Sequence, residues 1–159
     1  MIFVCVGSRE YPFDRLFVEL DRLVECGKLQ EEIFAQIGQS KYIPKHYQYE
    51  RFLSADEFKQ WQEKADIIIS HAGVGSLIGA LKNQKKVIAV PRLAKYGEHI
   101  DDHQMQIASV FEKEEYLNCV YDINDLGDVI KTTQQRNHFV AYKKPSFVVD
   151  IIKDFISNN

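Results

Sequence analysis

The chain has 159 residues, of which 45% are hydrophobic and 27% are charged, and its formal net charge is −3. This length suits one domain with a substantial core, and the absence of a basic excess argues against a nucleic-acid partner. Its three cysteines lack C-x-x-C spacing, which argues against a disulfide framework and favours a reducing compartment. No apolar run is long enough to cross a bilayer, and the N-terminal stretch lacks the features of a signal peptide. We therefore expect one cytoplasmic domain over 1–159, held at a membrane only through another molecule.

The first part of the chain alternates strand and helix patterns. The spacing predicts strands over 2–6, 32–37 and 49–52 and helices over 12–26 and 54–64. Gly27 is placed to end the first helix, and Ser54 with Glu57 has the pattern of a capping box. In the first turn of the first helix, Asp14 and Arg15 are expected to offset the dipole and face solvent.

The stretch 65–90 is the most informative part of the sequence. The β-branched run 66–70 predicts a buried parallel strand, a glycine turn follows over 71–75, and residues 87–90 predict the next strand. Ser76 is expected to cap the helix between them. The N–H groups at such a helix start can hold an anion such as a diphosphate, and Gly73 and Gly75 let it approach the backbone closely.

Three interpretations of this glycine turn remain open. The glycines permit a tight turn and nothing more, they form a dinucleotide fingerprint, or they bind the diphosphate of a nucleotide sugar. The dinucleotide interpretation is disfavoured because no acidic residue follows the next strand, where Val90, Pro91 and Arg92 stand instead. The first strand also ends in a glycine turn, at Gly7 and Ser8, which either binds a phosphate or is an ordinary turn.

The last part of the chain continues the alternation of helices and strands. A loop over 92–100 collects charged and polar side chains, and Asp101 or Asp102 can cap the helix that follows it. A strand over 118–121, a helix over 124–132, a polar connector over 134–144 and an amphipathic helix over 145–157 complete the chain. The pattern predicts an α/β fold, a Rossmann-like parallel sheet flanked by helices.

Several of these motifs occur together in one known family. The motif His71–Ser76, followed by Pro91-Arg92 and then Glu98–Gln104, resembles the C-terminal half of the GT-B glycosyltransferases of the MurG type. The opening motif Val6-Gly7-Ser8, with residues 13–16, is also similar to that group. The resemblance is closest to its single-domain members, the Alg13-like proteins and the bacterial capsule and exopolysaccharide subunits of the PssE or CpsG type. It implies a UDP-sugar donor substrate and no separate cofactor.

The resemblance also implies roles for individual residues. The donor-binding residues would be Gly7, Ser8, His71, Gly73, Val74, Gly75, Ser76, Arg92 and Gln104. The catalytic residues would be Glu98, His99, Asp102 and His103. The base that takes the acceptor proton stays open among Glu98, His99 and Asp102, and His103 is interpreted as a donor to developing negative charge or as a capping residue. His99 and His103 are four residues apart, but we expect no metal site. Gly79 stands where the family carries a ribose-binding glutamate.

A single GT-B half implies a partner that completes the active site. The expected partner is a membrane-anchored Alg14-like or PssD-like subunit that brings a lipid-linked saccharide acceptor at the inner membrane face, and the predicted helix 145–157 could dock it. We expect an inverting transfer from UDP-galactose in capsule or exopolysaccharide synthesis, with UDP-N-acetylglucosamine as the alternative donor. A noncatalytic nucleotide-binding subunit that enhances a partner is the second class, and an NAD-dependent oxidoreductase is the third.

Overall fold

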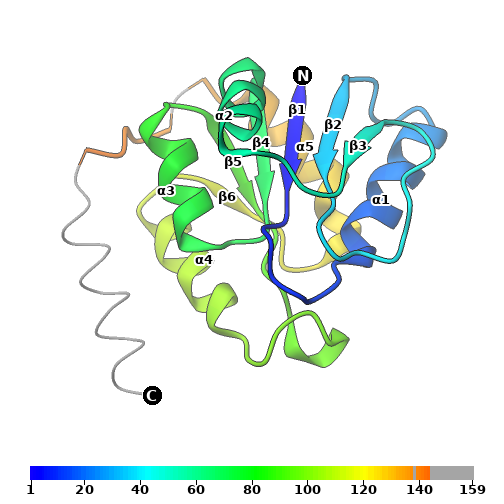
Figure 1. Cartoon of the computed structure of the whole chain (residues 1–159). Helices are drawn as coiled ribbons and strands as arrows, with labels where there is room; N and C mark the ends of the chain where they lie inside the picture. The colour runs from blue at the N-terminus through cyan, green and yellow to red at the C-terminus, as the bar shows by residue number, and fades with distance from the viewer. Residues whose placement is uncertain (138, 144–159) are drawn as a thin grey trace.

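The computed structural model describes residues 1–137 and 139–143 and has a sheet of six parallel strands at its centre (Figure 1). The strands are β1 (Ile2–Cys5), β2 (Ile33–Gln36), β3 (Gln48–Glu50), β4 (Ile67–Ser70), β5 (Lys86–Ala89) and β6 (Asn118–Cys119). The helices are α1 (Asp14–Glu25), α2 (Ala55–Lys64), α3 (Val74–Lys82), α4 (His103–Lys113) and α5 (Leu126–Gln135), with short 3₁₀ turns η1 (Ala94–Tyr96) and η2 (Ile123–Asp125). The predicted α/β fold with a Rossmann-like parallel sheet is confirmed. The helix expected over 145–157 lies outside the described residues.

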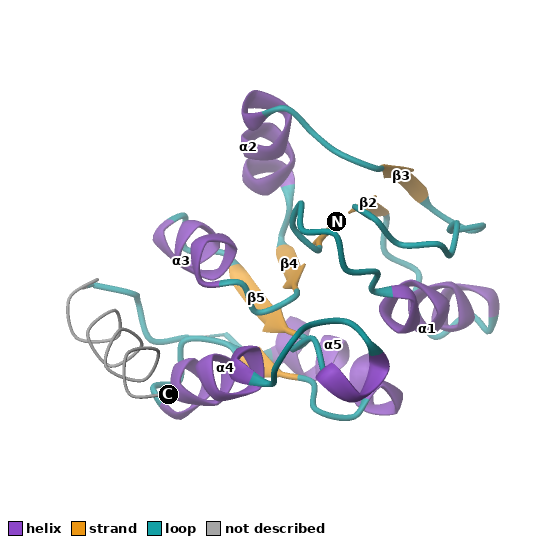
Figure 2. Ribbon diagram, turned by 60° about the horizontal axis from the view of Figure 1, so that its bottom comes forward, coloured by secondary structure: helices purple, strands orange, loops and turns teal. Residues whose placement is uncertain are grey.

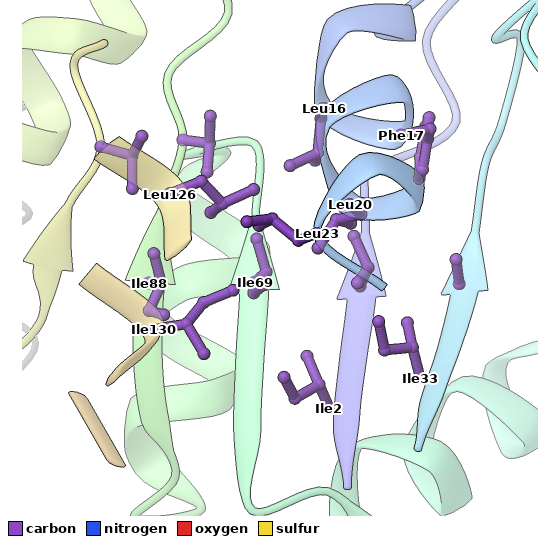
Figure 3. Close-up of a cluster of buried hydrophobic side chains, with 14 of the residues drawn as sticks. Ile2, Leu16, Phe17, Leu20, Leu23, Ile33, Ile69, Ile88, Leu126 and Ile130 are labelled. Atoms are coloured by element: carbon purple, nitrogen blue, oxygen red, sulfur yellow. The ribbon is translucent and has the colours of Figure 1, made fainter. Parts of the chain in front are cut away.

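Helices cover both faces of the sheet (Figure 2). Side chains of α1 and α5 pack on one face against alternate strand residues such as Ile2, Ile69 and Ile88 (Figure 3). Side chains of α2, α3 and α4 pack on the other face, where Phe3 and Ile68 point. Burial on both faces explains why the central strands read as continuous apolar runs in the sequence.

Two local predictions on the second face are confirmed. The Ser54 hydroxyl accepts from the N–H of Glu57, and the Glu57 carboxylate accepts from the N–H of Ser54, which together make the expected capping box of α2. Farther along α2, Trp61 stacks on Phe34 with ring centroids 3.7 Å apart, so it packs against the sheet. Cys5 is a buried thiol, and burial raises its pKa to about 12, against a smaller lowering influence of the Ser70 hydroxyl.

In the strand order β3-β2-β1-β4-β5-β6, the chain adds β2 and β3 on one side of β1 and then adds β4, β5 and β6 on the other side. The boundary between β1 and β4 is therefore the switch point of the sheet. The helix after β1 covers one face of the sheet, whereas the helix after β4 covers the other. The loops at the carboxyl ends of these two neighbouring strands therefore lead to opposite faces of the sheet, and this is the place where open α/β sheets bind their ligands.

The helices α1, α3 and α4 end in the same type of turn. In it, the N–H groups of residues just after the helix donate to carbonyls in its last turn. At α1 this turn uses Gly27 with a φ of 74°, which confirms the predicted stop. At α3 the equivalent position is Gln84 with a φ of 55°, and its N–H bonds to the carbonyl of Leu81. A left-handed conformation strains any residue with a Cβ, so the same motif is less stable with Gln84 than with glycine.

We expect Gln84→Gly to stabilise the domain by about 0.5 to 1 kcal/mol, because glycine adopts this φ without strain. The control is Lys82→Gly within α3, which should destabilise by about 1 kcal/mol because the backbone there is helical. Urea unfolding of the two variants beside the wild type measures both values. A destabilised Gln84→Gly variant would contradict the strain argument.

Candidate functional site

Three loops meet at the carboxyl edge of the sheet. They are the β1–α1 loop over 6–13, the β4–α3 loop over 71–73 and the β5–α4 loop over 90–102. Figure 2 brings this edge forward and shows the loops between the ends of α1, α3 and α4. All the residues predicted from sequence to bind the donor or act in catalysis lie in these loops or in the first turns of α3 and α4.

The N-terminus of α3 carries no side-chain cap. The helix begins at Val74, and its N-cap residue is Gly73, which has no side chain to cap with. The prediction that Ser76 caps this helix is therefore wrong, because Ser76 already lies inside the first turn. The first N–H groups of α3 face the loop edge without the usual side-chain oxygen, and they carry the positive end of the helix dipole. This arrangement suits an anion.

The loop that leads into α3 is strained. Ala72 has a φ of 63° although it is not glycine, and its side chain is fully buried. Unlike Gln84 it does not end a helix, so no common turn motif accounts for the conformation. Strain of this kind persists only where the surrounding structure holds it, and it recurs at ligand-binding loops.

His71 is a neutral, largely buried imidazole at the centre of the edge. Its Nδ1 lies 3.3 Å from the carbonyl oxygen of Cys5, and its ring lies between Gly7 and Gly73. A Cβ on Gly7 would meet the ring at 3.0 Å, and one on Gly73 would meet its Cε1 at 2.8 Å, so both glycines make room for the ring. Burial, with a smaller contribution from the charge of Arg92, lowers the pKa of His71 to about 4.

Arg92 lies under the loops with 2% of its surface exposed. Its Nη2 donates to the carbonyl of Val6 at 2.7 Å, and its Nη1 donates to the carbonyls of Tyr11 at 2.7 Å and Glu98 at 3.2 Å. Burial lowers the pKa of Arg92 to about 10, against the influence of Glu98, so it stays charged at neutral pH. The guanidinium thus joins the β1–α1 loop to the β5–α4 loop, and its donor-binding role stays a prediction.

Glu98 forms a second link between these two loops. One carboxylate oxygen accepts from Arg15 Nε at 2.7 Å, and the other accepts from the N–H of Leu93 at 3.0 Å. Arg15 also donates to the carbonyl of Pro91 at 2.6 Å. Glu98 is 3% exposed and both of its oxygens are engaged, so proton transfer from a substrate would have to displace one of these bonds.

Asp14 does lie in the first turn of α1, as expected of an acid that offsets the dipole, but the prediction that it forms a solvent-facing pair with Arg15 is wrong. Arg15 does not face solvent but pairs with Glu98, 83 residues away. Asp14 accepts through one oxygen from the N–H groups of Lys41 and Tyr42, which holds the loop after β2. Neither partner lies near in sequence, so the local pattern of the helix could not indicate these bonds.

Gln104 and Asp102 also take part in the internal bonding of the β5–α4 loop. The Oε1 of Gln104 accepts from the N–H of Arg92 at 3.2 Å, and Gln104 is 8% exposed. Asp102 accepts from the N–H of Ala94 at 2.9 Å while the rest of its side chain faces solvent. Their predicted contacts with substrate remain predictions.

His99 and His103 lie on either side of one carboxylate, that of Asp101. The Nδ1 of His103 is 2.7 Å from Asp101 Oδ2, and the Nδ1 of His99 is 3.1 Å from Asp101 Oδ1. As expected, His99 precedes the helix, since α4 begins at His103. Within residues 1–137 and 139–143, no group of three or more histidine, cysteine, aspartate or glutamate side chains is arranged to hold a metal ion.

Sequence reasoning missed Asp101 as a functional candidate and assigned it only a possible cap. It also missed Arg9, an exposed residue whose positive charge acts on both His71 and Arg92. The signal for Arg9 was its place directly after the Gly7-Ser8 turn, where a cation lies beside a possible phosphate-binding turn. Ser8 beside it is exposed, and Gly7 contacts the His71 ring.

Residues 1–157 match the glycosyltransferase family 28 C-terminal domain, and the chain belongs to this family. It is 28% identical to the human UDP-N-acetylglucosamine transferase subunit ALG13 over 125 residues. The alignment covers 73% of this chain and 10% of the human protein. The subunit of the same name from Candida albicans is 36% identical over 70 residues, which cover 44% of this chain and 22% of that protein. The chain thus spans about a tenth of the length of the human and mouse relatives.

Solved structures support the fold assignment. The match to an NMR solution structure of ALG13 covers 96% of this chain and 94% of that chain, with a TM-score of 0.63 and 19% sequence identity. The match to the crystal structure of MurG from Acinetobacter baumannii covers 98% of this chain and 49% of that chain, with a TM-score of 0.62 and 16% sequence identity. These likenesses show a single Rossmann-like domain of the GT-B C-terminal type. No helix in the part of the chain that the structure describes is long and apolar enough to span a membrane.

Proposed function

We propose that this chain is the donor-binding subunit of a UDP-sugar glycosyltransferase, and that its donor is UDP-N-acetylglucosamine. The observation that carries the proposal is the uncapped N-terminus of α3, preceded by the strained Ala72–Gly73 loop, at the switch point of a family 28 domain. The expected preference for UDP-galactose in capsule synthesis finds no support among the relatives. Those relatives, which are named as subunits of a UDP-N-acetylglucosamine transferase, favour the alternative donor.

The chemistry follows from the charges at the edge. An acceptor hydroxyl attacks the anomeric carbon, the bond to the diphosphate breaks, and UDP leaves with the electron pair. The N–H groups of Val74, Gly75 and Ser76 at the start of α3 would bind the diphosphate and stabilise its growing negative charge. The exposed guanidinium of Arg9 would add a positive charge from the opposite loop. In this proposal the attack inverts the anomeric carbon.

The acceptor side is proposed to come from another protein. The human and Candida relatives are named as subunits, and the chain matches one half of the two-domain MurG. We infer that a membrane-anchored Alg14-like subunit holds a lipid-linked saccharide over the carboxyl edge and recruits this chain to the inner membrane face. Ile100, which is 77% exposed in the β5–α4 loop, lies at the edge that such a partner would cover.

The experiment that tests donor binding is a thermal-shift series with UDP, UDP-N-acetylglucosamine, UDP-galactose and NADH. Ligand at a hundredfold excess over its dissociation constant should add about 2.7 kcal/mol of stability. Stabilisation by UDP compounds, strongest with UDP-N-acetylglucosamine, is the expected result. Stabilisation by NADH alone would replace the proposal with the dinucleotide interpretation, and a stronger response to UDP-galactose would return the donor to the first expectation.

A pair of glycine variants in α3 tests where the diphosphate binds. Gly75 has open space around the position of a Cβ, so Gly75→Ala should fold normally and gain up to about 1 kcal/mol of helix stability. In the proposed complex the added methyl group lies where the diphosphate approaches, so affinity for UDP should fall on the order of tenfold or more. Isothermal titration calorimetry with UDP measures this loss.

The control is Gly79→Ala, one turn farther along the same helix. Its Cβ would meet Gln62 at an ordinary contact distance of 3.6 Å, so the stability gain should be similar. Gly79 lies one turn from the N–H groups proposed to bind the diphosphate, and a methyl group is smaller than the glutamate that the family carries at this position, so UDP affinity should stay close to the wild-type value. Equal UDP affinities of Gly75→Ala and Gly79→Ala would contradict binding of the diphosphate at the start of α3.

A further inference from the structure

The carboxylate of Asp101 forms two contacts with histidine rings, one through each oxygen. Asp101 Oδ2 lies 2.7 Å from Nδ1 of His103, and Oδ1 lies 3.1 Å from Nδ1 of His99. Oδ1 also accepts from the backbone N–H of His103 at 3.0 Å, which ties the carboxylate to the first residue of α4. The ring of His99 in turn packs beside Tyr11 of the β1–α1 loop, with centroids 5.7 Å apart.

Asp101 stays ionised in this position. Burial tends to raise its pKa, but the hydrogen bonds from the backbone and ring of His103 outweigh it and hold the pKa below its ordinary value. The buried acidic side chain of this loop, Glu98, is paired with Arg15 and with the N–H of Leu93. Asp101 is therefore the carboxylate that the His103 ring meets.

An ionised carboxylate can only accept hydrogen bonds, so it selects one tautomer of a neutral imidazole. We therefore expect the proton of the neutral His103 ring on Nδ1, where it is donated to Asp101 Oδ2, and the lone pair on Nε2. About a third of the His103 side chain is exposed, so Nε2 is within reach of a molecule at the carboxyl edge.

We propose that Asp101 is a positioning residue that presents Nε2 of His103 as the proton acceptor of the transfer reaction. This inference rests on the proposed function. As the acceptor oxygen bonds to the anomeric carbon, its proton passes to Nε2, and the bond between that carbon and the diphosphate breaks with its electron pair going to UDP. The resulting imidazolium is stabilised by Asp101. This assignment differs from the sequence-based interpretation, in which His103 donates to negative charge and the base is a neighbour.

The charged groups that act on Asp101 are His103 and His99, which lie on either side of it in the sequence. The carboxylate of Asp101 thus directs the His103 ring so that Nε2 is the nitrogen left to accept a proton.

The test is the tautomer of His103, measured by ¹⁵N NMR of the ring nitrogens in the full chain. In the wild type we expect a protonated Nδ1 and a bare Nε2. In Asp101→Asn the amide oxygen can still accept the backbone N–H of His103, so this bond at the first residue of α4 is kept and the domain should stay folded. The amide nitrogen now donates to Nδ1, which should move the ring proton to Nε2 and abolish the base. Asp56→Asn, an exposed aspartate at the start of α2, is the control and should leave the His103 tautomer unchanged.

Addition of UDP separates this inference from the proposed function. If UDP binds the wild type and shifts the His103 ring resonances, the ring lies at the donor site as proposed. If UDP binds and the ring resonances do not respond, the placement of His103 at the reaction is overturned. If UDP does not bind, the proposed function fails while the tautomer result still stands on its own. A wild-type ring protonated on Nε2 would overturn the role of Asp101 in every case.

Discussion

Replacement of Arg92 by methionine is expected to destabilise the domain by about 3 to 5 kcal/mol, although the side chain volume is nearly kept. The guanidinium bonds to the carbonyls of Val6, Tyr11 and Glu98 and lies 5.2 Å from the centre of the Phe13 ring. Methionine would leave these carbonyls buried without partners, and each unpaired group costs about 1 to 3 kcal/mol. Lysine at this position should also destabilise, because one ammonium group cannot span the same three acceptors.

Urea unfolding of Arg92→Met beside Lys95→Met measures this effect. Lys95 is an exposed cation in the same loop, so its replacement removes a positive charge without removing buried hydrogen bonds, and its effect should stay within about 0.5 kcal/mol. Equal stabilities of the two variants would show that Arg92 does not hold the loops together. A large destabilisation in Arg92→Met would show that Arg92 has a structural role, which donor binding alone does not predict.

The stability of the wild type is expected to fall by about 3 kcal/mol more than that of His71→Asn as the pH is lowered from 7 to 4. The pKa of His71 is lowered to about 4 in the folded state, mainly by burial, whereas an unfolded histidine titrates at about 6.5. Between these values the unfolded chain binds a proton that the folded chain rejects. The stabilising effect is thus complete above pH 6.5 and is lost as the pH falls towards 4.

Asparagine is the matched replacement for His71, because its amide nitrogen can donate to the carbonyl of Cys5 in place of Nδ1 but does not titrate in this range. The unfolding free energies of the wild type and His71→Asn at several pH values give the contribution of His71 directly. The contributions of other acid-sensitive groups are the same in both proteins and cancel. His46→Asn serves as a control, since His46 is exposed and its loss should leave the pH profile unchanged. Parallel profiles for wild type and His71→Asn would show that His71 titrates normally in the folded chain.

The fold was predictable from sequence because its determinants are local. Strands buried on both faces give apolar runs, as at 2–6 and 66–70, and the cap residues Gly27 and Ser54 act within one turn of their own position. The assignment of a cap to Ser76 failed because a loop glycine, Gly73, already stands at the N-cap position. Which residue begins a helix after a glycine turn depends on backbone geometry that composition does not reveal.

The candidate site was predictable as a location and only partly as a set of roles. The loops that carry Gly7, His71 and Arg92 do meet at one edge, because parallel strands bring their carboxyl ends together. The bonds of Arg15 and Asp14 join residues 83 and 27 positions apart, and no local pattern encodes such pairs. The choice of donor sugar was the least predictable, because it depends on a few contacts with sugar hydroxyls while the motif itself is shared across the family.

The links made by Arg92 and Glu98 also bear on the engineering of this domain. They tie residues 6–15 to residues 91–98 through carbonyls and carboxylates at defined positions, so the two segments form one rigid unit. A chimera that imports the β5–α4 loop of a relative to change sugar preference would have to import the β1–α1 loop from the same relative. The loop that enters α3 is joined to this unit through His71, whose ring lies against Gly7 and whose backbone N–H and Nδ1 both lie near the carbonyl of Cys5, so a graft of that loop would have to keep Gly7 as well.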